Sequence, residues 1–263
     1  IGQNNRSLGI STADATKSIT ALKHQFTDFT KLDKEAQESL ATLTATMEKF
    51  GVSVEDTAAN IQFATKVMGL NTDQAGIAMR EIAATAVAIG ESPQRLAADF
   101  KAAAPQLAAF GDKAIDKFRE LAVVAKNTGL EMGKLLDFAE QFDTFEGAAG
   151  AVGKLNSLLK GNFLDSMQMV MTTDPTERIK MLRGALDQAG KSFDQMSVYE
   201  RKAIANAAGL KSVDDLAKLM KGDINALSQA AKEEALSQEK MNKMAQEAQT
   251  IMDKLKSVVM SFA

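Results

Sequence analysis

Apolar side chains recur at alternating steps of three and four residues from Thr12 to Phe50, where neither Gly nor Pro interrupts the chain. This spacing gathers apolar side chains into one stripe along an α-helix, which is typical of a coiled-coil seam. Asp33 is the one polar seam position. We therefore predict a single helix of about 54 Å, at roughly 1.5 Å per residue, and an N-terminal domain of residues 1–50. Its association seam consists of Ile19, Leu22, Phe26, Phe29, Leu40, Leu43, Met47 and Phe50.

A second stretch without Gly or Pro, residues 223–263, predicts a C-terminal long helix. Its apolar positions are weak in the middle and strong in the last three turns, so a partner is needed most near its end. For the first seam, a long helix lying over its own domain explains the periodicity equally well. The second seam consists of Ile224, Leu227, Met241, Met252, Leu255, Val259 and Phe262.

Between the seams, residues 51–222 form a region that glycines punctuate at steps of about twenty residues, which predicts repeated helical units. A glycine ends a helix well because it adopts the left-handed backbone conformation at little cost. Capping pairs such as Ser53 with Asp56, and Ser197 with Glu200, mark helix starts. We predict an array of short antiparallel helical hairpins, with helix breaks at Gly51, Gly69, Gly90, Gly111, Gly129, Gly150, Gly190 and Gly209.

The composition agrees with an all-α fold. Ala, Leu and Met dominate the apolar residues, only three Pro are present, and β-branched residues form no strand-like run. The chain has no cysteine, which excludes disulfides, thiolate metal sites and cysteine nucleophiles. The net charge of −3 comes without a strongly basic stretch, so no specific nucleic-acid partner is expected.

No catalytic site, metal site or cofactor is predicted, and the chain is not expected to be an enzyme. The one histidine, His24, falls on a helix face that should be solvated, and no second His or Cys stands at metal spacing. Adjacent carboxylates on a helix point about 100° apart, so they form no local acid and base pair. These adjacent carboxylates are Glu55 with Asp56, Asp214 with Asp215, and Glu233 with Glu234.

The segment Arg201–Lys221 imitates a DNA-binding helix-turn-helix, with a glycine-containing turn between two predicted helices. Its second helix opens with Asp214 and Asp215, whose negative charges would repel DNA phosphates. We therefore predict a structural hairpin here.

A Gly- and Ala-rich stretch carries Gly147, Gly150 and Gly153, which would let helices approach closely. Together with nearby phenylalanines it suggests a membrane-active region over residues 138–164, although the stretch, at about 14 residues, is too short to span a bilayer. A tight helix crossing or a flexible joint is the simpler interpretation.

The stretch VYERKAIANAAGLKSVDDLAKLMKGD, residues 198–223, together with the two seams and the Ala- and Met-rich middle, resembles tail tape measure proteins of tailed bacteriophages. The resemblance implies a virion structural protein that lies inside the tail tube and sets tail length during assembly in the host cytoplasm. It also implies release ahead of the DNA at infection. The implied partners are other copies of the chain, commonly as trimers, the tail tube, and baseplate hub or tail-tip proteins, with membrane contact only on ejection.

The glycine-punctuated middle departs from an uninterrupted rod. The chain also begins at Ile1 without an initiator Met and ends in an apolar stretch, so we expect a segment of a longer protein. Such a segment would dock at the tail tip or baseplate hub, or rearrange on ejection. The alternatives are a membrane-active protein inserting through residues 138–164 and an adaptor built from helical hairpins.

Overall fold

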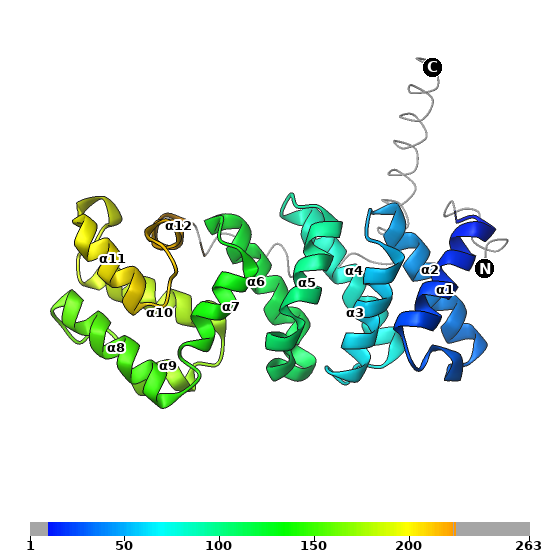
Figure 1. The fold of residues 1–263 in the computed structure, drawn as a ribbon, viewed down its shortest axis with the longest axis horizontal. Coiled ribbons are helices and arrows are strands. Elements are labelled where there is room, and N and C mark those ends of the chain that lie inside the picture. Colours follow the sequence, from blue (N-terminus) through cyan, green and yellow to red (C-terminus); the bar gives the residue numbers. More distant parts are fainter. Residues whose placement is uncertain (1–9, 223, 225–263) are drawn as a thin grey trace, which may run out of the picture. The chain divides into compact units, whose positions relative to one another are not determined.

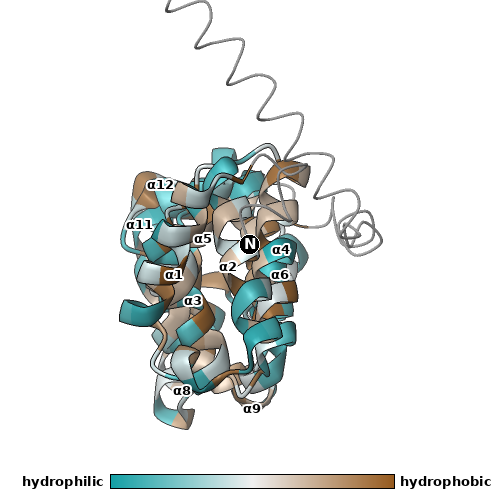
Figure 2. Cartoon of the chain, turned by 90° about the vertical axis from the view of Figure 1, so that its right-hand side faces the viewer, coloured by the Kyte–Doolittle hydropathy of each residue, from teal (hydrophilic) through white to brown (hydrophobic). Residues whose placement is uncertain are grey.

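The computed structural model describes residues 10–222 and residue 224 of the 263-residue chain. Within these residues the secondary structure is helical and contains no strand, which confirms the all-α prediction (Figure 1). Single helices carry both hydrophilic and hydrophobic residues, as amphipathic helices do (Figure 2).

The chain divides into two compact units. Among the described residues, unit 1 covers 10–115 and unit 2 covers 116–222 with residue 224. The division falls inside the region 51–222 that the glycines outline, and residues 10–50 belong to unit 1 together with the first hairpins.

Unit 1 is built from short helices joined by tight links. Helix α1 packs against α2 and α3, and α3 also packs against α4 and α5. Its elements are α1 (Thr12–Gln25), the 3₁₀-helix η2 (Phe29–Lys31), α2 (Lys34–Lys49), α3 (Val54–Lys66), α4 (Thr72–Ala88), α5 (Pro93–Leu107) and the 3₁₀-helix η3 (Ala108–Lys113).

The stretch 12–50 forms two helices, so the prediction of one continuous helix is wrong. Helix α1 stops at Phe26, whose backbone is extended, with φ −111° and ψ 100°. Helix α2 starts at the N-cap Asp33, whose carboxylate accepts a hydrogen bond from the backbone N–H of Ala36 at 2.8 Å. The single polar seam position is therefore a helix start, because an aspartate satisfies an unpaired N–H group better there than inside a seam.

The N-terminal seam packs inside unit 1. Six of its side chains are buried there, and Phe26 and Phe29 in the connection between the helices are 2% and 1% exposed. Ile19 and Phe50 are half-buried. The other buried seam residues are Leu22, Leu40, Leu43 and Met47.

Association between copies remains a prediction, and the N-terminal seam would have to leave the core of unit 1 to take part. In the C-terminal seam, Ile224 is buried. The remaining positions of that seam, Leu227, Met241, Met252, Leu255, Val259 and Phe262, lie outside the described residues.

Unit 2 follows the same plan. Helix α8 packs against α9 and α11, α7 packs against α10, and α12 packs against α10 and α11. The elements are α6 (Ala114–Thr128), which begins at the end of unit 1, α7 (Met132–Glu140), α8 (Phe145–Leu159), α9 (Ser166–Met171), α10 (Pro175–Gln188), the 3₁₀-helix η4 (Phe193–Gln195), α11 (Val198–Ala207) and α12 (Val213–Lys221).

Seven of the eight glycines expected to break helices have positive φ and lie at helix ends or links. The predicted break at Gly150 is wrong, because this residue lies within α8. Helix α8 ends instead at Lys160, which takes the left-handed conformation with φ 59°. One glycine lowers helix stability by only about 1 kcal/mol, and the buried neighbours Ala151 and Val152 offset that cost by packing.

The two kinds of glycine predict opposite responses to alanine. Gly69 has φ +74° and Gly150 has a helical backbone, and in both cases an added Cβ would meet nothing within 4 Å. Gly69→Ala should lower the free energy of unfolding by about 1 kcal/mol through backbone strain. Gly150→Ala should raise it by about 0.5–1 kcal/mol. Chemical denaturation of the two variants checks this, and shifts of the same sign would contradict the backbone assignment.

Candidate functional site

A buried arginine organises the centre of unit 2. Arg178 on α10 is 1% exposed, so its charge is removed from water and requires full hydrogen bonding. Its guanidinium donates five hydrogen bonds, to the carbonyl oxygens of Met169 (3.1 Å), Ala139 (2.5 Å), Phe142 (3.2 Å) and Val170 (3.4 Å) and to Oδ1 of Asp143 (2.5 Å).

Four of these acceptors are backbone carbonyls at or just beyond the C-terminal ends of α7 and α9. Helix C-termini carry unpaired carbonyl groups and a partial negative charge, so a cation is favourable there. Asp143 is 58% exposed at its side chain, which weakens its ion pair with Arg178 through solvent screening. The backbone carbonyls are therefore the principal partners of Arg178, and they hold the ends of α7 and α9 on α10.

Sequence reasoning did not single out Arg178. It stands in the apolar stripe of α10 beside Ile179 and Leu182, which are both fully buried. A charged residue within an apolar stripe of a helix is a sequence signal for a buried, hydrogen-bonded charge. The acceptors of Arg178 lie outside α10, so the sequence around Arg178 does not identify them.

The first turn of α11 is fixed by a capping box. Ser197 Oγ accepts a hydrogen bond from the N–H of Glu200 at 3.2 Å, and Glu200 Oε2 accepts one from the N–H of Ser197 at 2.9 Å. Lys191 Nζ donates to Oε1 of Glu200 at 2.7 Å. The hydrogen bond from Lys191, followed by those from Ser197, lowers the pKa of Glu200 to about 2.

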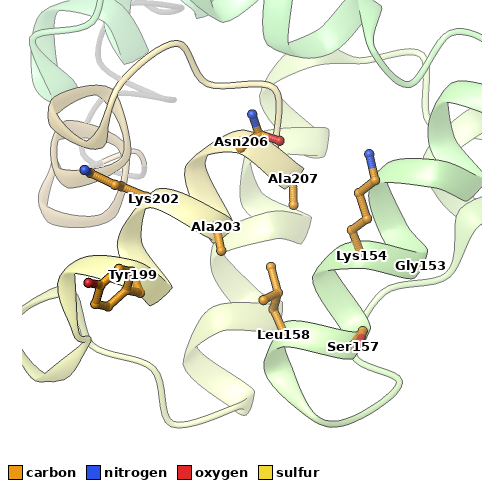
Figure 3. Close-up of a pocket in the computed structure, with 9 residues that line it drawn as sticks. All are labelled: Gly153, Lys154, Ser157, Leu158, Tyr199, Lys202, Ala203, Asn206 and Ala207. Atoms are coloured by element: carbon orange, nitrogen blue, oxygen red, sulfur yellow. The ribbon is translucent and has the colours of Figure 1, made fainter.

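An open groove of about 730 Å³ lies along the packed helices α8 and α11 (Figure 3). Leu158 and Ala203 lie at its centre in this view, and Tyr199 lies towards one end. The full lining is Gly153, Lys154, Ser157, Leu158, Tyr199, Lys202, Ala203, Asn206 and Ala207. We take this α8–α11 groove as the candidate interaction site.

The groove and its edge expose apolar and aromatic side chains together with lysines that have no ion-pair partner among the described residues. Tyr199 is 86% exposed and the adjacent Val198 is 59% exposed, both in the first turn of α11. Lys154 and Lys202 are exposed, and neither forms an ion pair with another described residue. Sequence reasoning missed this site, because it depends on α8 and α11 packing side by side.

The predicted hairpin of Arg201–Lys221 corresponds to the end of α11, a turn at Gly209 and α12. Asp215 is 1% exposed and accepts a hydrogen bond from Lys134 Nζ at 2.9 Å. Burial raises its pKa, but hydrogen bonds from Lys134 and Ser212 outweigh that effect, so the pKa lies below its ordinary value. This carboxylate joins α12 to α7.

The other candidate residues are dispersed. His24 is exposed on α1, and the described part of the chain contains no group of three or more His, Cys, Asp or Glu residues suited to a metal ion. Phe138 and Phe142 are buried, whereas Phe145 is 54% exposed. Among the described helices, none is both long and apolar enough to cross a bilayer.

Comparisons of the chain with protein-family models, with curated proteins and with solved structures gave no match.

Removing the guanidinium of Arg178 should destabilise unit 2 strongly. Arg178→Met keeps an apolar stem but leaves the buried carbonyls without a donor, so the free energy of unfolding should fall by about 3–5 kcal/mol. Arg95→Met is the matched control, because Arg95 is exposed and its ion pair with Glu91 is long at 3.7 Å. Denaturant unfolding of the full chain measures both, and equal effects would contradict the role of Arg178.

The capping box at Glu200 predicts a pH dependence. The folded-state pKa of about 2 lies below the ordinary value of 4.5, so Glu200 stabilises the fold above pH 4.5 and loses this contribution as the pH falls towards 2. Glu200→Gln should therefore be less stable than the unchanged chain at pH 7, and the gap should narrow between pH 4.5 and pH 2. Thermal unfolding across this range tests it. A gap that stays constant would show that the carboxylate carries no such linkage.

Proposed function

We propose that this chain is a folded segment of a tail tape measure protein, located in the tail interior of a tailed bacteriophage and docked at the tail tip or baseplate hub. The observation that carries the proposal is the stretch 198–223, which resembles that family. Residues 198–221 of it form the hairpin α11–α12 and one wall of the α8–α11 groove. In this role the chain is part of a protein that sets tail length during assembly in the host cytoplasm and leaves the tube ahead of the DNA.

The short helices support docking at an end of the tape. A single helix is about 10–12 Å wide with its side chains, whereas each unit here packs several helices side by side. Folded units of this kind are too wide to act as the thin rod that a mid-tube ruler requires. We therefore assign this segment to a terminal docking role, with the length-setting rod supplied by other parts of a longer tape.

Other copies of the chain are part of this proposal. Self-association, as trimers in the manner of the family, would use the C-terminal seam from Leu227 to Phe262, because six N-terminal seam residues are already buried in unit 1. The proposal includes no enzymatic activity, cofactor or specific nucleic acid, and membrane contact only on ejection.

Purified tails of a phage that encodes this chain test the proposal. Cross-linking and mass spectrometry should find the chain in a few copies per tail, linked to tail-tip or baseplate hub proteins. Cryo-electron microscopy of the same tails should place the folded units at the tip. Absence of the chain from purified tails would contradict the proposal, and density for residues 10–222 as straight helices in mid-tube would contradict the docking role.

No observation specifically favours either alternative function, membrane insertion or an adaptor of helical hairpins. Insertion into a membrane through residues 138–164 would require Phe138 and Phe142 to leave the core of unit 2. An adaptor of helical hairpins would use the same groove as a docked tape segment, and the presence or absence of the chain in purified tails distinguishes these two roles.

A further inference from the structure

Among the described residues, the lining of the α8–α11 groove carries positive charge and no carboxylate. Lys154 and Lys202 are the charged residues of its lining, and neither pairs with another described residue. On the same helix as Lys202, Glu200 is engaged by Lys191 and by the capping box. A ligand with carboxylates would therefore meet two available ammonium groups.

The lining of the groove allows close approach of another backbone. Gly153, Ala203 and Ala207 contribute little side-chain volume, and side-chain size determines how near two helix axes can come. Gly153 lies inside α8, where glycine lowers helix stability by about 1 kcal/mol relative to alanine. An added Cβ at Gly153 would meet nothing within 4 Å, so its surroundings in this structure leave room for a side chain.

Tyr199 supplies an anchor at one end of the groove. Its ring is 86% exposed, and burial of an aromatic ring is among the largest contributions a single residue makes to an interface. The groove residues from Tyr199 to Ala207 cover about two helical turns, or roughly 12 Å along α11. This length matches a short bound helix.

We propose that the α8–α11 groove binds an acidic amphipathic α-helix of a partner protein. Apolar residues of that helix would pack on Leu158, Ala203 and Tyr199, and its Asp or Glu residues would pair with Lys154 and Lys202. Binding of a helix through an apolar stripe in a groove is a recurrent mode of peptide recognition.

A second copy of the same face is a poorer occupant. Two such grooves related by twofold symmetry would bring the two lysines of one groove, Lys154 and Lys202, towards the two lysines of the other, and like charges at an interface oppose association. The inference does not depend on the proposed role in the tail, because it concerns the purified chain and a peptide.

Two designed peptides of 18 residues test the proposal by fluorescence anisotropy with the full chain. Both carry an Ala and Leu stripe, flanked by Glu in one and by Lys in the other. The Glu peptide should bind at least ten times more tightly than the Lys peptide. The double variant Lys154→Glu with Lys202→Glu should reverse this preference. The control Lys23→Glu with Lys34→Glu, which makes the same charge change at exposed sites in unit 1, should preserve it.

A steric variant tests the position of binding separately. Gly153→Phe should fill the groove and weaken binding of the Glu peptide at least tenfold. Gly133→Phe is the matched control, because Gly133 is also an exposed glycine in a helix of unit 2 with nothing within 4 Å of an added Cβ. Unchanged circular dichroism and thermal unfolding would show that each variant keeps its fold.

Three results would overturn the proposal. The first is equal binding of the two peptides, or no binding of either. The second is unchanged binding to a folded Gly153→Phe chain. The third is binding to vesicles rich in phosphatidylserine, lost in the Lys154→Glu with Lys202→Glu variant, without binding of the Glu peptide. That result would assign the groove to a lipid surface.

Discussion

The guanidinium of Arg178 joins two helix ends that are separated along the chain by all of α8. A buried arginine stabilises a fold only when its donors are satisfied, because the loss of one partner leaves a charge or a carbonyl group unpaired in a medium of low dielectric. The ends of α7 and α9 must therefore assemble on α10 together. Helix α8 follows the end of α7 along the chain and packs on α9, so its position depends on the same arginine.

Only the α8 wall of the α8–α11 groove depends on Arg178. Its α8 wall is held by the arrangement around Arg178, and its α11 wall is held by the capping box at Glu200 and by Lys191. A surface fixed on both walls by hydrogen bonds, with two lysines that pair with no other described residue, is preformed, and a preformed surface lowers the ordering cost that a binding partner would meet. A docking segment in a larger assembly needs such a surface, and this connects the geometry of unit 2 with the proposed role at an end of the tape.

The sequence predicted helix ends well where a single residue determines the backbone conformation at the end. A left-handed backbone at a helix end favours glycine strongly, and Gly69 and Gly209 were recognisable for that reason. The same reasoning failed at Gly150, because a mid-helix glycine is a small cost that packing offsets. The apolar spacing failed as a predictor between Phe26 and Asp33, because the spacing continues across the connection between α1 and α2, and both helices bury their apolar side chains in unit 1.

Contacts between distant helices left no local signal. The acceptors of Arg178 lie 8 to 39 residues away along the chain, and the groove needs α8 beside α11. In the sequence, Gly153 stands out only as a small residue and Tyr199 only as part of the stretch 198–223, because the role of each in the groove depends on the opposite wall. The structure describes in full only the first of the two predicted seams. The first seam packs within unit 1, and most of the second lies outside the described residues.

The apolar stripes of α1 and α2 are buried by the chain itself, which makes this a folded segment and not a bare rod. Hydrogen exchange of the full chain, followed by mass spectrometry over a hundredfold range of protein concentration, tests it most directly. We expect slow exchange in α2 that is the same at every concentration. Protection of α2 that appears only as the concentration rises would contradict the account, because it would show that other copies of the chain cover the seam.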